Sequence, residues 1–126
     1  QYTMAADRLL GDLAHLNNPW QPAVLKMIKM TVEGAQRASV TAGKKKYVSV
    51  CGEAAADPAL AVVLIGLGVD TLSMNAGAIP AVAAVLKSVT KEKAQQIAAI
   101  ALQQISSAEA KESARKALPI LDELGL

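Results

Sequence analysis

The chain has 126 residues, enough for one ordinary domain and too few for two. Hydrophobic residues make up 52% of it, mostly small aliphatic ones with no Phe, and its formal net charge is only +2, so a sizeable core must be buried. No stretch of about 18 apolar residues runs uninterrupted, which argues against a membrane span, and the lysines at 44–46 are typical of a solvated loop rather than of a nucleic-acid site.

The first quarter of the chain predicts two helices. Leucines recur at helical spacing over 5–16, and Asn17-Asn18-Pro19 ends that helix because proline cannot continue it. A second helix begins at Pro22, where proline fits the first turn, and is expected to end near Arg37. Residues 41–46 are expected to form a loop.

A strand and a buried helix are predicted next. The β-branched segment Tyr47–Cys51, bounded by Gly52, is typical of a strand. Asp57 followed by proline marks a helix start, since Asp accepts from free N–H groups there. The helix Pro58–Leu67 is apolar almost all round and must be buried, and Gly68 is placed to end it.

The same alternation then repeats. Val69–Met74 predicts a second strand, Gly77 a loop, and Pro80–Val89 another helix. The order strand, helix, strand, helix is typical of an α/β fold with two parallel neighbouring strands joined by a right-handed crossover.

The last third predicts two further helices, over Lys91–Ile105 and Ser107–Leu118. Ser106, with Glu109 three residues later, has the spacing of a capping box at the start of the second. Pro119 is expected to end or kink that helix.

Two strands alone do not make a stable parallel sheet, because both faces need covering and both edges stay open. The chain also opens on Gln1-Tyr2-Thr3 without a methionine. We therefore expect it to be a piece of a larger α/β domain.

Functional groups of parallel α/β folds gather where the strands end. Here those places are 51–57 and 74–77, which makes Cys51 the first candidate for chemistry; the alternative is a buried structural thiol. The only histidine, His15, has no acidic residue placed to orient it and suits a helix surface. One cysteine, one histidine and scattered acids give no zinc spacing.

Other candidates are weaker. Glu53 and Asp57 are candidate ligands for a hard cation, but Asp57 already has a capping role. Gly66-x-Gly68 lies at a helix end and is therefore no phosphate loop. Arg8 is either a surface residue or a clamp for phosphate, whose oxygens a guanidinium binds in pairs.

Two segments resemble enzyme I of the bacterial sugar phosphotransferase system. One is the opening Gln-Tyr-Thr-Met-Ala-Ala-Asp-Arg at 1–8, and the other is Val50–Pro58, followed by Gly-Leu-Gly at 66–68 and Leu-Ser-Met at 72–74. The motif Cys-Gly-Glu-x-x-x-Asp at 51–57 is shared with pyruvate phosphate dikinase and phosphoenolpyruvate synthase, so a fragment of either is an alternative. The resemblance covers essentially the whole chain. The sequence departs from the family at 40–46, where its loop is longer than the family's.

The resemblance implies the carboxyl-terminal part of a (β/α)₈ TIM barrel, with residues 1–126 running from its sixth helix through its eighth and tail helices from about 91. Such a domain binds phosphoenolpyruvate and Mg²⁺. Its phosphoryl group passes to a histidine on an amino-terminal domain and then to a phosphocarrier protein for sugar uptake. The family implies a cytoplasmic protein, to be expected with a single unpaired cysteine, and we also expect a homo-oligomer.

By family motif, Cys51 is the acid that protonates enolpyruvate, and Arg8 holds the substrate phosphate. A free thiol with a pKa of about 8.5 is mostly protonated near pH 7, as an acid must be. His15 does not match the phosphorylated histidine. No metal ligand is expected within this chain, because the family's acidic ligands precede residue 1, and the isolated chain is expected to be inactive. A non-catalytic, self-associating module is the alternative outside the enzyme class.

Overall fold

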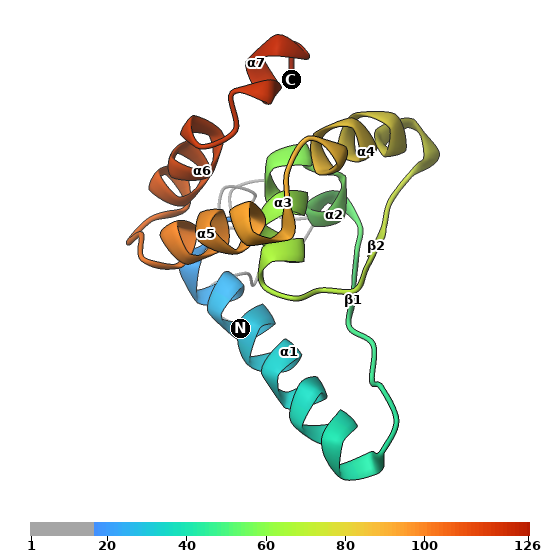
Figure 1. Ribbon diagram of the computed structural model, residues 1–126. Helices are drawn as coiled ribbons and strands as arrows, with labels where there is room; N and C mark the ends of the chain where they lie inside the picture. Colours follow the sequence, from blue (N-terminus) through green and yellow to red (C-terminus); the bar gives the residue numbers. More distant parts are fainter. Residues whose placement is uncertain (1–16) are drawn as a thin grey trace.

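The structure is a computed structural model that describes residues 17–126. The helix predicted over 5–16, with Arg8 and His15, lies outside the described residues. The elements, in chain order (Figure 1), are α1 Pro22–Ala42, β1 Ser49–Cys51, α2 Glu53–Ala56, α3 Pro58–Gly66, β2 Thr71–Ser73, the 3₁₀ helix η2 Ala76–Ala78, α4 Ile79–Lys87, α5 Lys91–Leu102, α6 Ser107–Lys116 and α7 Ile120–Glu123.

The two strands pair in parallel, as the sequence predicts, with Ser49 opposite Thr71 and Cys51 opposite Ser73. Both are shorter than predicted, three residues each. In each, only the middle residue, Val50 or Leu72, is half-buried, while its neighbours are exposed. The described chain is thus mostly helical with one parallel strand pair, in agreement with the predicted α/β class.

Helix α3 forms the centre of the core. Six of its residues, Ala59–Leu64, are buried, which confirms the expectation from its apolar sequence. Helices α4, α5 and α6 pack around it, as Figure 1 shows. A Cβ added to Gly66 would lie 2.1 Å from the carbonyl oxygen of Ala94, so glycine is needed there because α3 and α5 approach so closely.

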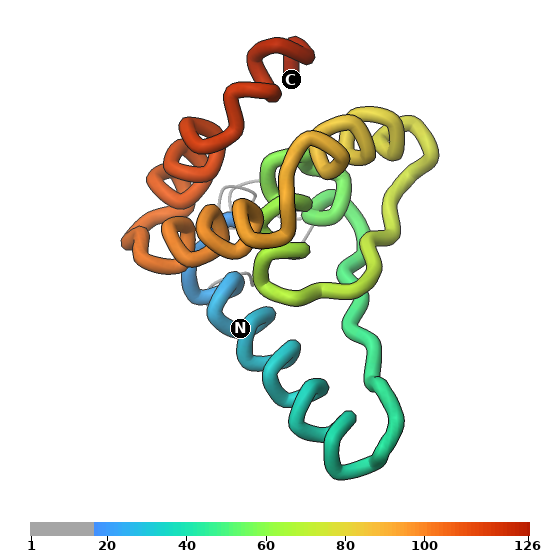
Figure 2. Tube along the Cα trace, in the orientation of Figure 1, coloured from blue at the N-terminus to red at the C-terminus, as the bar shows by residue number. Residues whose placement is uncertain are grey.

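Helix α1 is longer than predicted and extends away from the helical core (Figure 2). It continues past Arg37 to Ala42, because Ala38–Ala42 contains no helix breaker. Gly43, with φ of 60°, ends it, and the N–H groups of Gly43 and Lys44 donate to the carbonyls of Val40 and Ser39. Only the four residues 43–46 of the expected loop are therefore non-helical ahead of Tyr47.

Both predicted helix caps are present. The N–H groups of Ala59 and Leu60 donate to Asp57 Oδ1 at 2.9 and 3.1 Å. The N–H of Glu109 donates to Ser106 Oγ at 3.2 Å, and Glu109 accepts in return from Ile105, one residue before the cap.

The remaining differences concern short segments. Gly77, expected in a loop, lies in η2, and the four-residue helices α2 and α7 were not expected. Both tail helices begin where predicted and end early: α5 ends at Leu102, three residues before Ile105, and α6 ends at Lys116, two residues before Leu118. The four-residue helices α2 and α7 have too few turns to give a periodic pattern in the sequence. Among the described helices, none is both long and apolar enough to cross a membrane.

Candidate functional site

Cys51 is the last residue of β1, and its side chain is exposed. The structure therefore contradicts the alternative of a buried structural thiol. Its partner across the strand pair is Ser73, the last residue of β2, and the N–H of Gly52 donates to the Ser73 carbonyl at 2.9 Å. The thiol thus lies at the carboxyl-end edge of a parallel strand pair, where the sequence places it.

Gly52 turns the chain sharply directly after the thiol. Its φ of 87° and ψ of −153° belong to a backbone region that only glycine occupies readily. Its carbonyl then accepts from the N–H groups of Ala55 and Ala56, which begins α2. Gly52 therefore fixes where Cys51 lies relative to the helix that follows.

Asp57 closes the same motif and has a structural role. While Oδ1 caps α3, Oδ2 accepts from the indole Nε1–H of Trp20 at 2.9 Å, and Lys111 Nζ lies 3.9 Å from Oδ2. Trp20, only 3% exposed, joins the core. Asp57 thereby ties the segment before α1 to the loop that carries Cys51, a contact over 37 residues that no local sequence signal indicates.

The end of β2 is organised in the same way. Asn75, two residues after Ser73, accepts through its side chain from the N–H of Ala78 at 3.0 Å and so caps η2. Asn75 and Gly77 are exposed beside the end of β2. The two post-strand segments thus each contain a polar side chain fixed by a helix start, Asp57 in one and Asn75 in the other.

The described residues hold no cluster of metal-binding side chains. Residues 17–126 contain no group of three His, Cys, Asp or Glu side chains placed to hold a metal ion. Glu53 is exposed next to Cys51, and Asp57 is engaged by a cap and an indole N–H. Within the described part of the chain, Glu53 is therefore the one carboxylate beside Cys51 that no helix cap engages.

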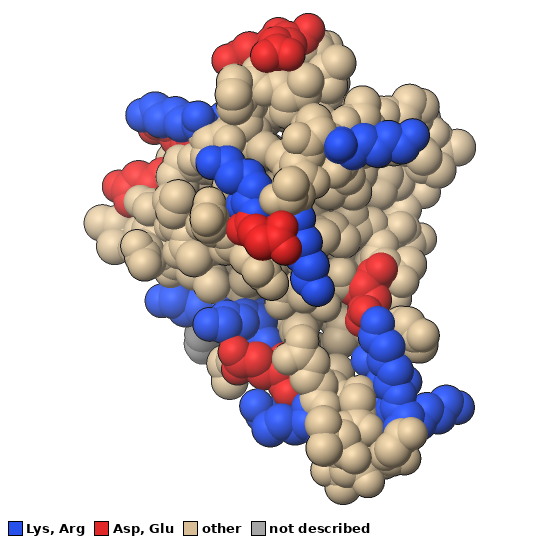
Figure 3. Space-filling model, viewed as in Figure 1, with Lys and Arg blue, Asp and Glu red and all other residues tan. Residues whose placement is uncertain are grey.

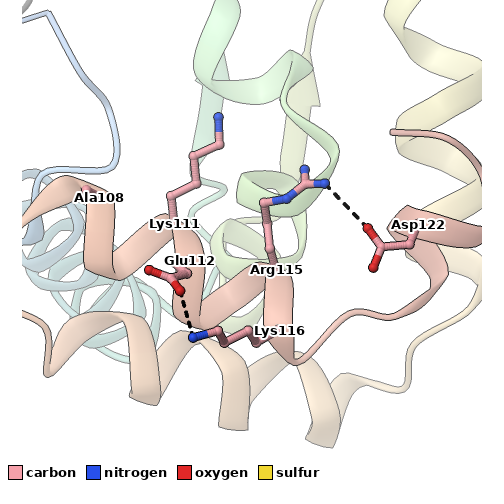
Figure 4. A pocket seen from close by; sticks show the side chains of 6 residues that line it. All are labelled: Ala108, Lys111, Glu112, Arg115, Lys116 and Asp122. Atoms are coloured by element: carbon pink, nitrogen blue, oxygen red, sulfur yellow. Dashed lines mark ion pairs between the residues drawn. The ribbon is translucent and has the colours of Figure 1, made fainter.

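Three hollows formed by residues 17–126 have no residue of 51–57 in their lining. One, of about 460 Å³, is formed on α6 and by Asp122 of α7. In Figure 4, Lys116 reaches Glu112 within α6, while Arg115 points toward Asp122 at 3.9 Å. Its charges are paired, with Lys111 on Asp57, and no residue of 51–57 or 73–77 lines it, so it does not include the Cys51 edge.

Comparison with known proteins identifies the family. Residues 1–91 match the family described as PEP-utilising enzyme, PEP-binding domain. Three relatives, each named phosphoenolpyruvate-protein phosphotransferase, come from Streptomyces coelicolor (44% identical over 118 residues), Geobacillus stearothermophilus (41% over 97) and Haemophilus influenzae (34% over 109).

These alignments cover 94%, 77% and 86% of this chain but only 20%, 16% and 18% of the respective relatives. The chain thus spans about a fifth of the length of the curated relatives that it matches. The family match covers both strands, the Cys51 loop and helices α1 to α4. The chain belongs to the PEP-utilising enzyme family and corresponds to a carboxyl-terminal part of its PEP-binding barrel domain.

Proposed function

We propose that this chain is part of the PEP-binding catalytic domain of a phosphoenolpyruvate-protein phosphotransferase. The relatives carrying that name, and the Cys-Gly-Glu-x-x-x-Asp motif at 51–57, support the proposal. In the longer protein, the phosphoryl group of phosphoenolpyruvate passes to a histidine on an amino-terminal domain and then to a phosphocarrier protein. Residues 1–126 supply the sixth through eighth helices of the barrel and the tail helices from about 91.

Cys51 acts in the step that follows phosphoryl transfer. Loss of the phosphoryl group leaves the enolate of pyruvate, whose methylene carbon takes a proton from the Cys51 thiol. A new C–H bond forms, the S–H bond breaks, and the products are pyruvate and a thiolate that regains its proton from water. The observation that carries this role is the exposure of Cys51 at the carboxyl end of β1, directly before the Gly52 turn.

Arg8 holds the phosphate of the substrate in this proposal. A guanidinium binds two phosphate oxygens at once and stabilises negative charge on the group being transferred. The support is the match of residues 1–8 to the family's segment, since residues 1–91 align with the family.

Mg²⁺ is the cofactor of the complete domain, with ligands contributed by other parts of the longer protein. Mg²⁺ would neutralise charge on the phosphate. The 126-residue chain alone is accordingly expected neither to bind Mg²⁺ tightly nor to form pyruvate. We place the protein in the cytoplasm, where a catalytic thiol stays reduced.

The decisive experiment replaces Cys51 by alanine in a full-length phosphotransferase containing this segment. Pyruvate formation should fall by about 10²–10⁴-fold, the usual contribution of a general acid. Phosphoryl exchange between the phosphohistidine and the carrier should be unchanged, because the thiol takes no part in it. Equal loss of both activities would show a structural role instead.

Ser73→Ala is the matched control, because it changes the residue paired with Cys51 on the same strand edge. Both activities should stay within a few-fold of the parent. A loss equal to that of Cys51→Ala would mean that any change at this edge disturbs the site, and the proton-donor role would then lack support.

Exposed apolar surface supports a homo-oligomer. Met27 and Met30 on α1 are 62% and 67% exposed, and the strand pair has no further strand in the described residues. Unpaired strand edges and apolar patches favour association. The 126-residue chain should therefore sediment as a dimer or larger species at micromolar concentration, and a monomer would contradict this.

A further inference from the structure

A second hollow lies at the opposite end of the strand pair from Cys51. It has a volume of about 300 Å³ and is formed by four segments: one side of α1, the loop between α1 and β1, the turn between α3 and β2, and the first residue of α5. Its charged residues are Lys45, Lys46, Lys91 and Asp70, and its apolar wall includes Val32, Ala35 and Val48.

The acidic residue of this hollow is already neutralised. Asp70 Oδ1 lies 2.6 Å from Lys45 Nζ, and Asp70 Oδ2 accepts from the N–H of Val48 at 3.0 Å. These contacts hold the pKa of Asp70 below its ordinary value. Lys45 also lies 4.6 Å from the ring centre of Tyr47. With one lysine matched to the one carboxylate, two positive charges remain.

Those two charges come from Lys46 and Lys91, which lie 45 residues apart in the sequence. Within residues 17–126, neither forms an ion pair. Figure 3 shows Lys and Arg side chains gathered at the lower right, around the loop that follows α1. The hollow is thus a concave surface with two lysines that form no ion pair within the described residues.

The loop that contributes Lys46 is held in place. The N–H of Lys46 donates to Ser39 Oγ at 2.8 Å, and the Ser39 hydroxyl donates to the Ala35 carbonyl at 2.7 Å. Gly43 and Lys44 close α1 through their N–H groups, and Lys45 is fixed on Asp70. A preorganised loop loses less entropy when a ligand binds.

We propose that this hollow binds a small phosphate monoester, with its dianionic group between Lys46 and Lys91 and its carbon portion on the apolar wall. The volume is at the lower end of the range for small-molecule sites, which suits a compound of a few carbons. Two lysines match the double negative charge of a phosphate ester. The proposal does not depend on the role of Cys51, which lies at the other end of β1.

The test is a titration of the isotopically labelled 126-residue chain with glycerol 3-phosphate and, separately, with inorganic phosphate at matched ionic strength. Backbone amide shifts should saturate and centre on 45–48, 68–70 and 91. The ester should bind about threefold more tightly than inorganic phosphate, because it also covers the apolar wall. Shifts centred on 51–53 and 73–75, or shifts that do not saturate, would overturn the proposal.

Lysine variants provide matched pairs for this titration. Lys46→Gln and Lys91→Gln should each weaken ester binding by about three- to tenfold, and added NaCl should weaken it further. Lys44→Gln and Lys93→Gln remove the same charge from the same loop and helix, but neither residue lines the hollow. Equal weakening by all four variants would mean non-specific attraction to a positive surface, and the proposal would fail.

All four lysines are exposed, so the folded structure should survive each substitution. Circular dichroism of each variant checks this directly. Equal affinity for glycerol 3-phosphate and inorganic phosphate would contradict the part of the proposal that assigns the carbon portion to the apolar wall.

Discussion

Helix α3 and the strand pair are adjacent in the sequence but differ in environment. Residues 59–64 of α3 are buried on every side, whereas the first and last residues of both strands are exposed. In most parallel α/β folds the strands are the more buried elements, because helices cover both faces of the sheet. Here the helices pack on one another around α3, and the strand pair lies at the side of that core (Figure 1).

The residues that stabilise the fold and the candidate catalytic residue therefore lie in different regions of the molecule. Buried apolar area, the main favourable term in folding, is concentrated on α3 and the helices around it. The candidate catalytic thiol is exposed at the end of β1 and contributes little to that area. Substitutions in α3 should therefore unfold the chain, and substitutions at Cys51 should alter activity alone.

The sharpest test compares Leu64→Ala with Cys51→Ser in the 126-residue chain. Leu64 is fully buried, so its truncation should lower the free energy of unfolding by about 2–5 kcal/mol. Cys51→Ser, an exposed and nearly isosteric change, should stay within about 0.5 kcal/mol of the parent. Urea denaturation followed by circular dichroism measures both, and a destabilised Cys51→Ser variant would refute the separation.

Asp57 is where the two regions meet, because it caps α3 and closes the cysteine loop. Asp57→Ala should cost about 2–4 kcal/mol, combining a lost cap with an unpaired indole N–H on buried Trp20. Asp57→Asn is the control, since its amide oxygen still caps the helix; it should lose about half as much or less. The fluorescence of Trp20, the single tryptophan, reports the same change locally. Equal losses in the two variants would show that the cap contributes little.

Features set by neighbouring residues could be predicted from the sequence. Asp57-Pro58 and Ser106 with Glu109 mark helix starts through contacts within four residues, and both caps are present. The β-branched segment 47–51, bounded by Gly52, likewise predicts the end of β1 at Cys51. The resemblance to the family also rests on local segments, at 1–8, 50–58, 66–68 and 72–74, and the family match over residues 1–91 bears it out.

Features set by distant residues could not be predicted. Nothing local joins Trp20 to Asp57, or Lys45 to Asp70, because each contact depends on how helices and strands pack. The apolar pattern predicts an end of α1 near Arg37, whereas the helix continues to Ala42 and ends at Gly43. The roles of Cys51 and Arg8 stay predictions, and Arg8 lies outside the described residues. A local pattern therefore located the thiol but not the contact that fixes its loop.

The smallest expected effect concerns two glycines that lie in helices for different reasons. Gly66→Ala places a methyl group against the backbone of Ala94, at 2.1 Å from its carbonyl oxygen, and should cost about 1–3 kcal/mol. Gly34→Ala, inside α1, meets only the end of the Arg37 side chain at 3.9 Å and should stabilise the chain by about 0.4–1 kcal/mol. Thermal denaturation of the two variants should therefore shift the midpoint in opposite directions. A midpoint that does not fall in Gly66→Ala would mean that α5 moves to accommodate the methyl group, and the close packing of α3 on α5 would then not be what requires glycine. A midpoint that falls in Gly34→Ala would contradict the expectation that α1 has room for a methyl group there.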